Sequence, residues 1–280
     1  MNPPVVLAVA GTDSGGAAGL AADLTTIAAL GAHGACVVAA VTAQDTTGVR
    51  AVHAVPADVI AAQLDAVLED LPVAAVKTGM LGSVDAVRSV VDRCAHLPLV
   101  VDPVLVATSG AVLADEAVRA AYVEHLLPVA SVVTPNAAEA RTLLGLPDAD
   151  ATPAPELAAR LAELGCAVVV TGGPDGDDRE CTDWLAVPGR SPVALRHPAV
   201  ETRNDHGTGC THSAALATHL SHGLAVPDAA RAALEFTTDR LRAGRDWSLG
   251  RGRGPVAHLF PTSPPVPVVS AGSTNERNHS

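Results

Sequence analysis

The sequence predicts an α/β fold in which helices cover both faces of a mostly parallel central sheet, and three observations support this. The first is composition: 48% of the 280 residues are hydrophobic and 17% are charged, which supplies enough apolar material for a large core. The second is that short apolar runs alternate with longer helical stretches. The third is that polar residues directly follow several apolar runs, as they do at the carboxyl ends of parallel strands.

The apolar runs and the periodic stretches place the elements along the chain. Continuous apolar runs predict buried strands at residues 5–10, 35–43, 73–77, 99–102, 131–134 and 167–171. Apolar residues at helical spacing predict helices near residues 20–30, 57–70, 84–95, 114–127, 137–144 and 154–164. After residue 171 two short strands, at 184–187 and 193–196, predict a hairpin, and a further apolar helix is expected at 213–220.

The chain shows no internal repeat and no linker between residues 5 and 260, so we expect residues 1–260 to form a single domain. Residues 261–280 contain Pro, Ser and Asn without periodicity, which predicts a disordered tail.

Charge and composition argue against several classes of protein. A net charge of −12 opposes binding to nucleic acid or to an anionic membrane, and 2% aromatic residues leave little for base stacking. No apolar run reaches the roughly 18–20 residues of a membrane span, and the N-terminus has no basic region typical of a signal peptide. The five cysteines form no CxxC pair, which predicts reduced thiols in a cytoplasmic protein.

An anion site is predicted where His206-Gly207-Thr208-Gly209-Cys210 opens a helix. Glycines let backbone amides approach a ligand, and a helix N-terminus offers unpaired N–H donors. A tight turn with Thr208 or Thr211 as the helix cap is the plainer explanation. The thiol of Cys210 would have a lowered pKa at a helix start, or would be inert if it is buried. A lysine-containing phosphate loop is excluded, because the only lysine, Lys77, does not follow a glycine.

Five polar segments follow predicted strands, at residues 11–16, 42–45, 77–80, 102–103 and 134–139. Any one of them is explained by a turn or a helix cap. Because parallel strands end at one edge of a sheet, five such segments together predict a ligand site there.

The same segments carry a resemblance that extends in register over nearly the whole chain except the tail. Residues 11–24, 30–34, 41–46, 76–81, 101–104, 134–140, 206–211 and 250–255 are similar to motifs of the hydroxymethylpyrimidine/phosphomethylpyrimidine kinases of thiamine biosynthesis. That family belongs to the ribokinase-like superfamily, so the resemblance implies a three-layer α/β/α sandwich.

The resemblance implies a site for 4-amino-5-hydroxymethyl-2-methylpyrimidine. Gly11 lies in the first motif, Gln44 would read the aminopyrimidine edge with its donor and acceptor, Asp23 would be a second polar contact, and Met80 would pack against the ring. Taken alone, these residues read as a surface Gln, a helix-face Asp and a core Met.

The resemblance also implies ATP and Mg²⁺. Asp102 and Glu139 would hold the metal, since Mg²⁺ prefers oxygen ligands. Asn136, Thr171 and Gly173 would lie along the nucleotide phosphates, although capping a helix explains Asn136 equally well. The amides of Gly207, Thr208, Gly209 and Cys210 resemble the superfamily's anion hole, with Cys210 at the position of the base, where many members have Asp.

Two positions depart from the family pattern. Many relatives have Lys-Gly-Gly where this chain has Thr171-Gly172-Gly173, so a positive contact to the phosphates is lost or comes from an arginine elsewhere. Many relatives also have Gln where this chain has Ala21.

The implied activity is ATP-dependent phosphorylation of the hydroxymethylpyrimidine and of its monophosphate, by a protein expected to form a homodimer. One alternative is a pyridoxal kinase, against which the paired donor and acceptor of Gln44 argue. The other is a catalytically weak pyrimidine-binding protein, which Thr171 and the unusual base would fit.

Overall fold

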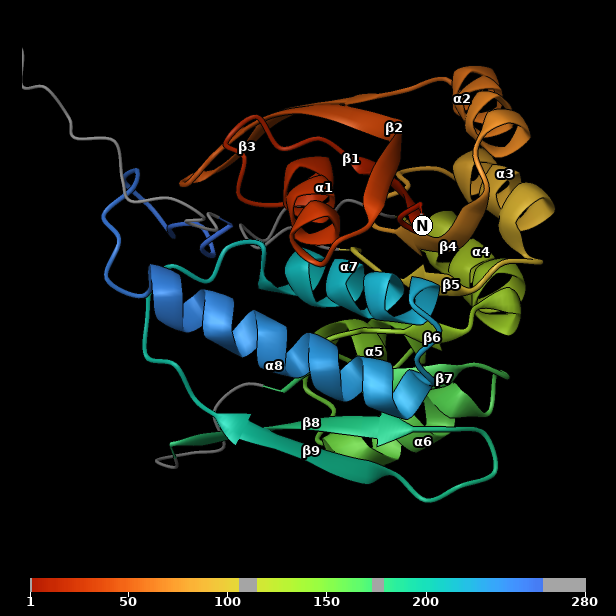
Figure 1. Cartoon of the computed structure of the whole chain (residues 1–280). Coiled ribbons are helices and arrows are strands. Elements are labelled where there is room, and N and C mark those ends of the chain that lie inside the picture. Colours follow the sequence, from red (N-terminus) through yellow and green to blue (C-terminus); the bar gives the residue numbers. More distant parts are fainter. Residues whose placement is uncertain (1, 106–114, 173–178, 259–280) are drawn as a thin grey trace, which may run out of the picture.

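A computed structural model describes residues 2–105, 115–172 and 179–258, and its strands form one sheet (Figure 1). The strands are β1 (Val5–Gly11), β2 (His33–Asp45), β3 (Gly48–Ala54), β4 (Val73–Thr78), β5 (Leu99–Val101), β6 (Val132–Val133), β7 (Ala167–Val170), β8 (Glu180–Ala186) and β9 (Val193–Pro198). Their order across the sheet is β3-β2-β1-β4-β5-β6-β7-β8-β9. The neighbours from β2 to β7 are parallel, whereas β3 pairs antiparallel at one edge and β8 and β9 at the other.

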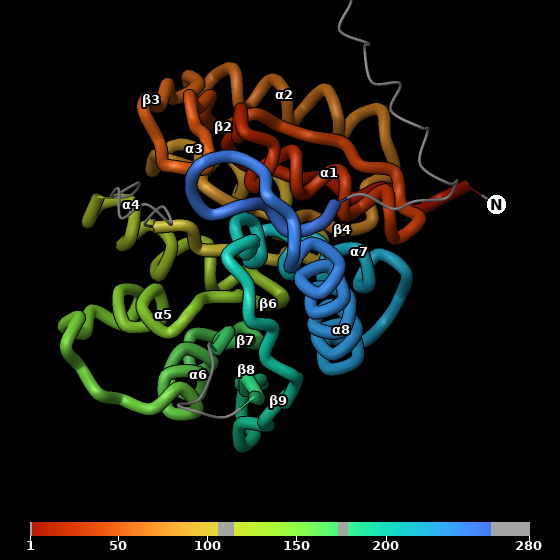
Figure 2. The backbone as a smooth tube through the Cα atoms, turned by 90° about the vertical axis from the view of Figure 1, so that its left-hand side faces the viewer, coloured from red at the N-terminus to blue at the C-terminus, as the bar shows by residue number. Residues whose placement is uncertain are grey.

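Helices cover both faces of this sheet. They are α1 (Gly19–Ala29), α2 (Ala57–Asp70), α3 (Val84–Cys94), α4 (Glu116–Ala121), α5 (Ala137–Leu143), α6 (Ala154–Ala162), α7 (Thr208–Ser221) and α8 (Val226–Gly244). Figures 1 and 2 show α1, α7 and α8 together on one face and α2 to α6 on the other. The predicted three-layer α/β/α sandwich is confirmed.

The sequence of strand β1 is continuously apolar because both of its faces pack against helices. Val5, Leu7 and Val9 belong to the core that packs against α2 and α3, whereas Val6 and Ala8 belong to the core beneath α1, α7 and α8. Successive side chains of a strand point to opposite faces, and both faces are covered here. Every residue of β1 is therefore buried.

The six predicted parallel strands and the hairpin are confirmed, although β8 begins at Glu180, four residues before the predicted start. Two elements were not predicted. Strand β3 has no buried residue, so no apolar run marks it. Helix α8 was missed, although Pro227 stands in its first turn, a favoured place for proline.

The helix predicted at 114–127 is divided in the structure, and residue 114 lies outside the described residues. Helix α4 ends at Ala121, a π-helical turn runs over Tyr122–Leu126, and a 3₁₀ turn over Leu127–Val129 contains Pro128. Proline removes a backbone donor and interrupts regular helix. The predicted disordered tail also lies outside the described residues. Within the described residues, no helix is both long and apolar enough to span a membrane.

The only lysine of the chain lies in the middle of this fold. Lys77, at the end of β4, is fully buried, and its Nζ donates a hydrogen bond of 2.7 Å to Oδ1 of Asp23 on α1. Its Nζ also lies 3.8 Å from Oδ2 of Asp102, just after β5. Burial by itself disfavours the ammonium, but the carboxylate of Asp23, helped by that of Asp102, raises the pKa of Lys77 above its ordinary value.

We expect Asp23→Asn to lower the free energy of unfolding by about 3 kcal/mol, because it leaves a buried ammonium without its main counter-charge. Urea denaturation followed by circular dichroism measures this loss. Asp239→Asn is the control, since Asp239 pairs with Arg242 on the exposed side of α8, and we expect a change of at most about 0.5 kcal/mol. Equal, small losses for both variants would contradict the importance of the buried pair.

Candidate active site

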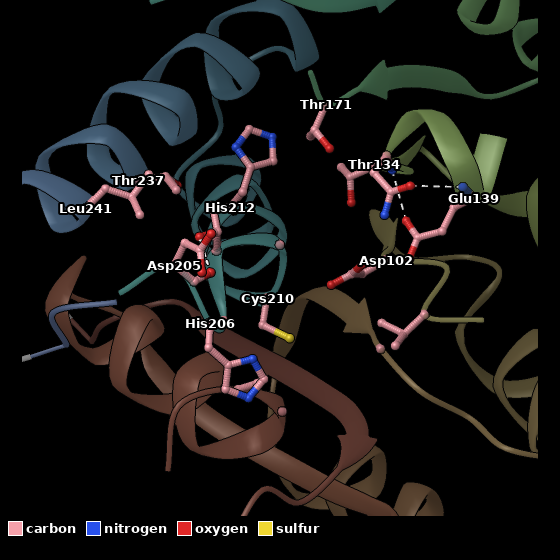
Figure 3. A pocket seen from close by; sticks show the side chains of 18 of the residues that line it. Asp102, Thr134, Glu139, Thr171, Asp205, His206, Cys210, His212, Thr237 and Leu241 are labelled. Carbon is pink, nitrogen blue, oxygen red and sulfur yellow. Dashed lines mark hydrogen bonds between the residues drawn. The ribbon is translucent and has the colours of Figure 1, made fainter. Parts of the chain in front are cut away.

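One cavity of about 870 Å³ opens at the carboxyl edge of the parallel strands (Figure 3). All five polar segments that follow predicted strands contribute to it, through Thr12, Gln44, Lys77, Asp102 and Asn136 among others. The N-terminus of α7 forms another part of its wall. The edge of the sheet therefore brings together residues that are far apart in the sequence.

Three of the residues predicted to bind the substrate, Gly11, Gln44 and Met80, line the same cavity. Met80 is 9% exposed, and its Cε lies so near Gly11 that a Cβ on that glycine would be 2.5 Å away. The amide nitrogen of Gln44 lies 3.0 Å from Nε2 of His206. An apolar side chain and an anchored amide thus face a common space, which suits a flat heterocycle with a polar edge.

The loop after β1 is held by the carboxylate of Asp13. Its oxygens accept hydrogen bonds from the backbone amides of Gly15, Ala17 and Ala18 at 2.8–3.1 Å. Its Oδ2 also lies 3.5 Å from Nε2 of His206. Burial alone would raise the pKa of Asp13, but these hydrogen bonds, led by the contact with His206, lower it, so the carboxylate is ionised.

Asp23, the fourth residue predicted to contact the pyrimidine, is not among the residues that line the cavity. It is fully buried, and its carboxylate bonds Lys77 below the cavity floor. Its position fits a role in fixing Lys77. The family resemblance implied a contact of Asp23 with the pyrimidine, and a helix-face Asp beside a loop gives no local sign of a partner 54 residues away.

The segment predicted to form an anion site lies directly before α7 and in its first turn. Gly207 has φ of +91°, and a Cβ at this position would collide with the carbonyl oxygen of Ala17. Only glycine fits there without strain. Among the described residues, no acceptor is found for the amides of Gly209 and Cys210, which open the 14-residue helix α7. These free donors and the helix dipole favour an anion at this point.

The thiol of Cys210 lines the cavity above Lys77 and points into it (Figure 3). Burial raises its pKa to about 12, against the opposing effect of the Lys77 ammonium. The lowered pKa considered for a helix start is therefore wrong, because burial outweighs the helix terminus here. A protonated thiol cannot accept the proton of a substrate, so the role of base requires a thiolate that this site disfavours.

Asp102 and Glu139, predicted to hold a metal, both face the cavity from the same side in Figure 3. Oδ2 of Asp102 accepts a hydrogen bond of 3.0 Å from Ser213 on α7. Burial and the charge of Asp102 raise the pKa of Glu139 to about 8. The negative charge of Asp102 thus disfavours ionisation of Glu139, and a cation between these two oxygen ligands would relieve that repulsion. No group of three or more potential metal-ligating side chains occurs within the described residues.

On the nucleotide side, the capping explanation of Asn136 is confirmed. Its side chain accepts from the amide of Glu139, and the carboxylate of Glu139 accepts from the amide of Asn136, both at 2.9 Å. Thr171 lines the cavity after β7. Gly173 lies outside the described residues. Arg253 is the one arginine among the described lining residues, and it is engaged in an ion pair with Asp205.

Several lining residues received no role from the sequence. Asp13 and His206 lie inside the quoted motifs, where their side chains could have been singled out. His212 follows Thr208 by four residues on α7, and this helical spacing could have shown that the two share a face. Asp183 and His197 lie on the hairpin β8–β9, and no local pattern marks them as neighbours of α7.

The raised pKa of Cys210 predicts slow alkylation. At pH 7 we expect iodoacetamide to modify the exposed Cys36 first, and Cys210 as slowly as the buried Cys94 and Cys166, whose pKa values burial raises to about 11 and about 12. Peptide mass spectrometry over time gives the rate at each site. Modification of Cys210 as fast as that of Cys36 would show an accessible thiolate and would support its role as the base.

The comparisons with known proteins agree with this geometry. Residues 13–257 match the family model described as phosphomethylpyrimidine kinase. The hydroxymethylpyrimidine/phosphomethylpyrimidine kinase of Rhizobium meliloti is 45% identical, over 91% of this chain and 97% of its own. The kinase of the same name from Synechococcus elongatus is 42% identical, over 93% of this chain and 99% of its own.

A solved structure shows the same architecture. The pyridoxal kinase of Bacillus subtilis in complex with ADP has a TM-score of 0.81 and 31% identity, over 92% of this chain and 98% of its own. Its nucleotide complex is consistent with a kinase site. The family model and the two relatives match nearly the whole described chain, and the protein therefore belongs to the phosphomethylpyrimidine kinase family.

Proposed function

We propose that this protein is a kinase that transfers the γ-phosphoryl group of ATP to 4-amino-5-hydroxymethyl-2-methylpyrimidine and then to the monophosphate so formed. The observation that carries the proposal is the cavity itself, which has Gln44 and Met80 in one part and the free amides of α7 in another. One part suits an aminopyrimidine, and the other suits a phosphoryl group. Membership of the family supports the same assignment.

In the proposed reaction, the hydroxymethyl oxygen forms a bond to the γ-phosphorus, the bond from the γ-phosphorus to the β-phosphate oxygen breaks, ADP leaves, and the hydroxyl proton is released to solvent. The amides of Gly209 and Cys210 would stabilise the negative charge of the transferring group. The ammonium of Lys77 adds a fixed positive charge beneath this point, beside Asp102 and Cys210. Catalysis would come mainly from positioning and charge stabilisation, as is usual in phosphoryl transfer.

Mg²⁺ would be held by Asp102 and Glu139, and when bound it would neutralise charge on the phosphates. These two residues have separate structural tasks as well. Asp102 accepts a hydrogen bond from the hydroxyl of Ser213 and so contacts α7. The carboxylate of Glu139 accepts a hydrogen bond from a backbone amide and so caps the first turn of α5. Both carboxylates are therefore fixed before any ligand arrives.

Pyridoxal phosphorylation is the second candidate, because the pyridoxal kinase of Bacillus subtilis shares the fold closely. The amide of Gln44 favours the aminopyrimidine, since it offers a donor and an acceptor together. A pyrimidine-binding protein with little activity is the third, and Thr171, in place of the family's lysine, is the feature that motivates it.

Three further properties remain predictions. We propose that residues 1–260 act as one domain, that the protein forms a homodimer, and that it works in the cytoplasm. Strand β3 is an edge strand, and Val52 on it is 48% exposed, so this edge of the sheet is available for contact with a second copy.

The substrate assignment is tested with ATP, Mg²⁺ and an equimolar mixture of the aminopyrimidine alcohol and pyridoxal, with products identified by mass. We expect the pyrimidine monophosphate and diphosphate to dominate. Gln44→Leu should lower kcat/KM for the pyrimidine by roughly ten- to two-hundredfold, because it leaves a polar edge unpaired in a desolvated site.

Gln63→Leu is the matched control for that variant, because Gln63 bonds the backbone of Val38 away from the cavity. It should leave kcat/KM close to that of the wild type. Preferential phosphorylation of pyridoxal would move the assignment to the second candidate. Ligand-induced stabilisation without turnover of ATP would support the pyrimidine-binding protein.

The raised pKa of Glu139 predicts how the need for Mg²⁺ changes with pH. Below about 8 the folded protein holds Glu139 protonated, so the metal must displace that proton. The Mg²⁺ concentration for half-maximal rate should therefore fall as pH rises from 6 to 9, and Glu139→Gln should remove most of that dependence. Identical pH profiles for the wild type and the variant would reassign Glu139 to capping α5 alone.

A further inference from the structure

Two histidines line the part of the cavity where the nucleotide is expected, and neither has a hydrogen bond at Nε2. His212 on α7 is 3% exposed, and its Nε2 has no partner among the described residues. Nε2 of His197 on β9 is also buried and without a hydrogen bond there. Both side chains belong to the lining of the cavity. A buried polar atom left unpaired destabilises a fold, so its presence at a cavity wall points to a ligand.

His212 lies on α7 close to the proposed anion site. It lies one turn beyond Thr208 and three residues beyond Gly209, so it shares a face of α7 with these two residues of the first turn. In Figure 3 its ring projects between Thr171 and Thr237, on the side of the cavity away from His206. The apolar side chains of Leu234 and Leu241 line the cavity on α8. His212 therefore stands between the place for a transferring phosphoryl group and a surface that suits a base.

Asp183 completes this group of side chains. It is 3% exposed, and its Oδ1 accepts a hydrogen bond of 2.8 Å from the amide of Gly172. The same oxygen lies 3.6 Å from Nε2 of His197. Its negative charge acts on His212 as well. Asp183 thus fixes the backbone next to Thr171 and holds a compensating charge close to both imidazoles.

The same region lacks a free cationic side chain. Thr171, which lines this wall, has no charge. Among the described lining residues, Lys77 is bonded to Asp23 and Arg253 is paired with Asp205. An imidazole N–H of His212 or His197 is a polar donor that this wall can offer to an anion.

We propose that His212, supported by His197 and Asp183, forms a subsite that binds an anionic oxygen of the nucleotide's phosphate chain, an inference that rests on the proposed use of ATP. His212 is a binding residue in this subsite. Its N–H would donate to a phosphate oxygen that the first turn of α7 does not reach. The subsite would hold the part of the nucleotide that stays behind after transfer, so it should bind ADP as well as ATP.

The test measures binding of ADP, AMP and adenosine by titration calorimetry to the full-length wild type and to three variants. His212→Leu removes the donor and keeps the approximate volume, and His212→Gln keeps a donor. His219→Leu is the control, because His219 lies two turns further along α7, also has a buried unpaired Nε2, and does not line the cavity.

We expect His212→Leu to weaken ADP binding roughly tenfold or more, the usual effect of losing a hydrogen bond to a charged group. His212→Gln should recover part of that loss, and His219→Leu should bind ADP like the wild type. Without nucleotide, His212→Leu should melt at the same or a higher temperature, because it removes an unpaired buried polar atom, whereas its stabilisation by ADP should shrink.

Two results would overturn the inference. One is unchanged ADP affinity in His212→Leu, and the other is an equal loss for adenosine, which would assign His212 to the ribose or the base. Failure of the proposed function is seen separately, as absence of pyrimidine phosphorylation by the wild type while it still binds ADP. If His212→Leu does not fold, the ADP affinity of His212→Gln is compared with that of His219→Leu. Weaker binding by His212→Gln supports the inference, and equal binding overturns it.

Discussion

Lys77 is the only lysine of the chain, and its ammonium group is fully buried. A buried charge is tolerated only when opposite charges face it, and here Asp23 and Asp102 do so from α1 and from the end of β5. Three elements must therefore keep their positions for the cation to be stable. The same cluster lies under Cys210 and the first turn of α7, so the condition that stabilises Lys77 also fixes the floor of the cavity.

Hydrogen bonds of side chains and backbone join the loops at this edge of the sheet. Asn204 donates to the carbonyl oxygens at the end of α8, and His206 pairs with the segment at Pro255. Ser14 bonds both the amide and the carbonyl of Gln44, which fixes the end of β2 against the loop after β1. The residues proposed to bind the pyrimidine and the anion site are thus held by short polar contacts within one layer.

Charge is distributed unevenly around the cavity. The carboxylates of Asp102 and Glu139 face the helix terminus of α7, whose amides favour anions. On the wall near Thr171, burial lowers the pKa of His212 below its ordinary value despite the nearby Asp183, so this imidazole is neutral. The ligands proposed above would complete this site. A cation would lie between the two carboxylates, and phosphate oxygens would bind to the amides and the imidazoles.

The sequence by itself determined the layers, the parallel strands and the edge at which the ligand site lies, because continuous apolar runs and polar strand ends are local features. It also placed Gly11, Gln44, Met80 and the glycines before α7 at that edge. Only the tertiary structure decided that Asp23 faces Lys77, that burial keeps Cys210 protonated, and that His197 and His212 meet Asp183. These outcomes depend on desolvation and on partners distant in the chain, and neither is encoded in the spacing of neighbouring residues.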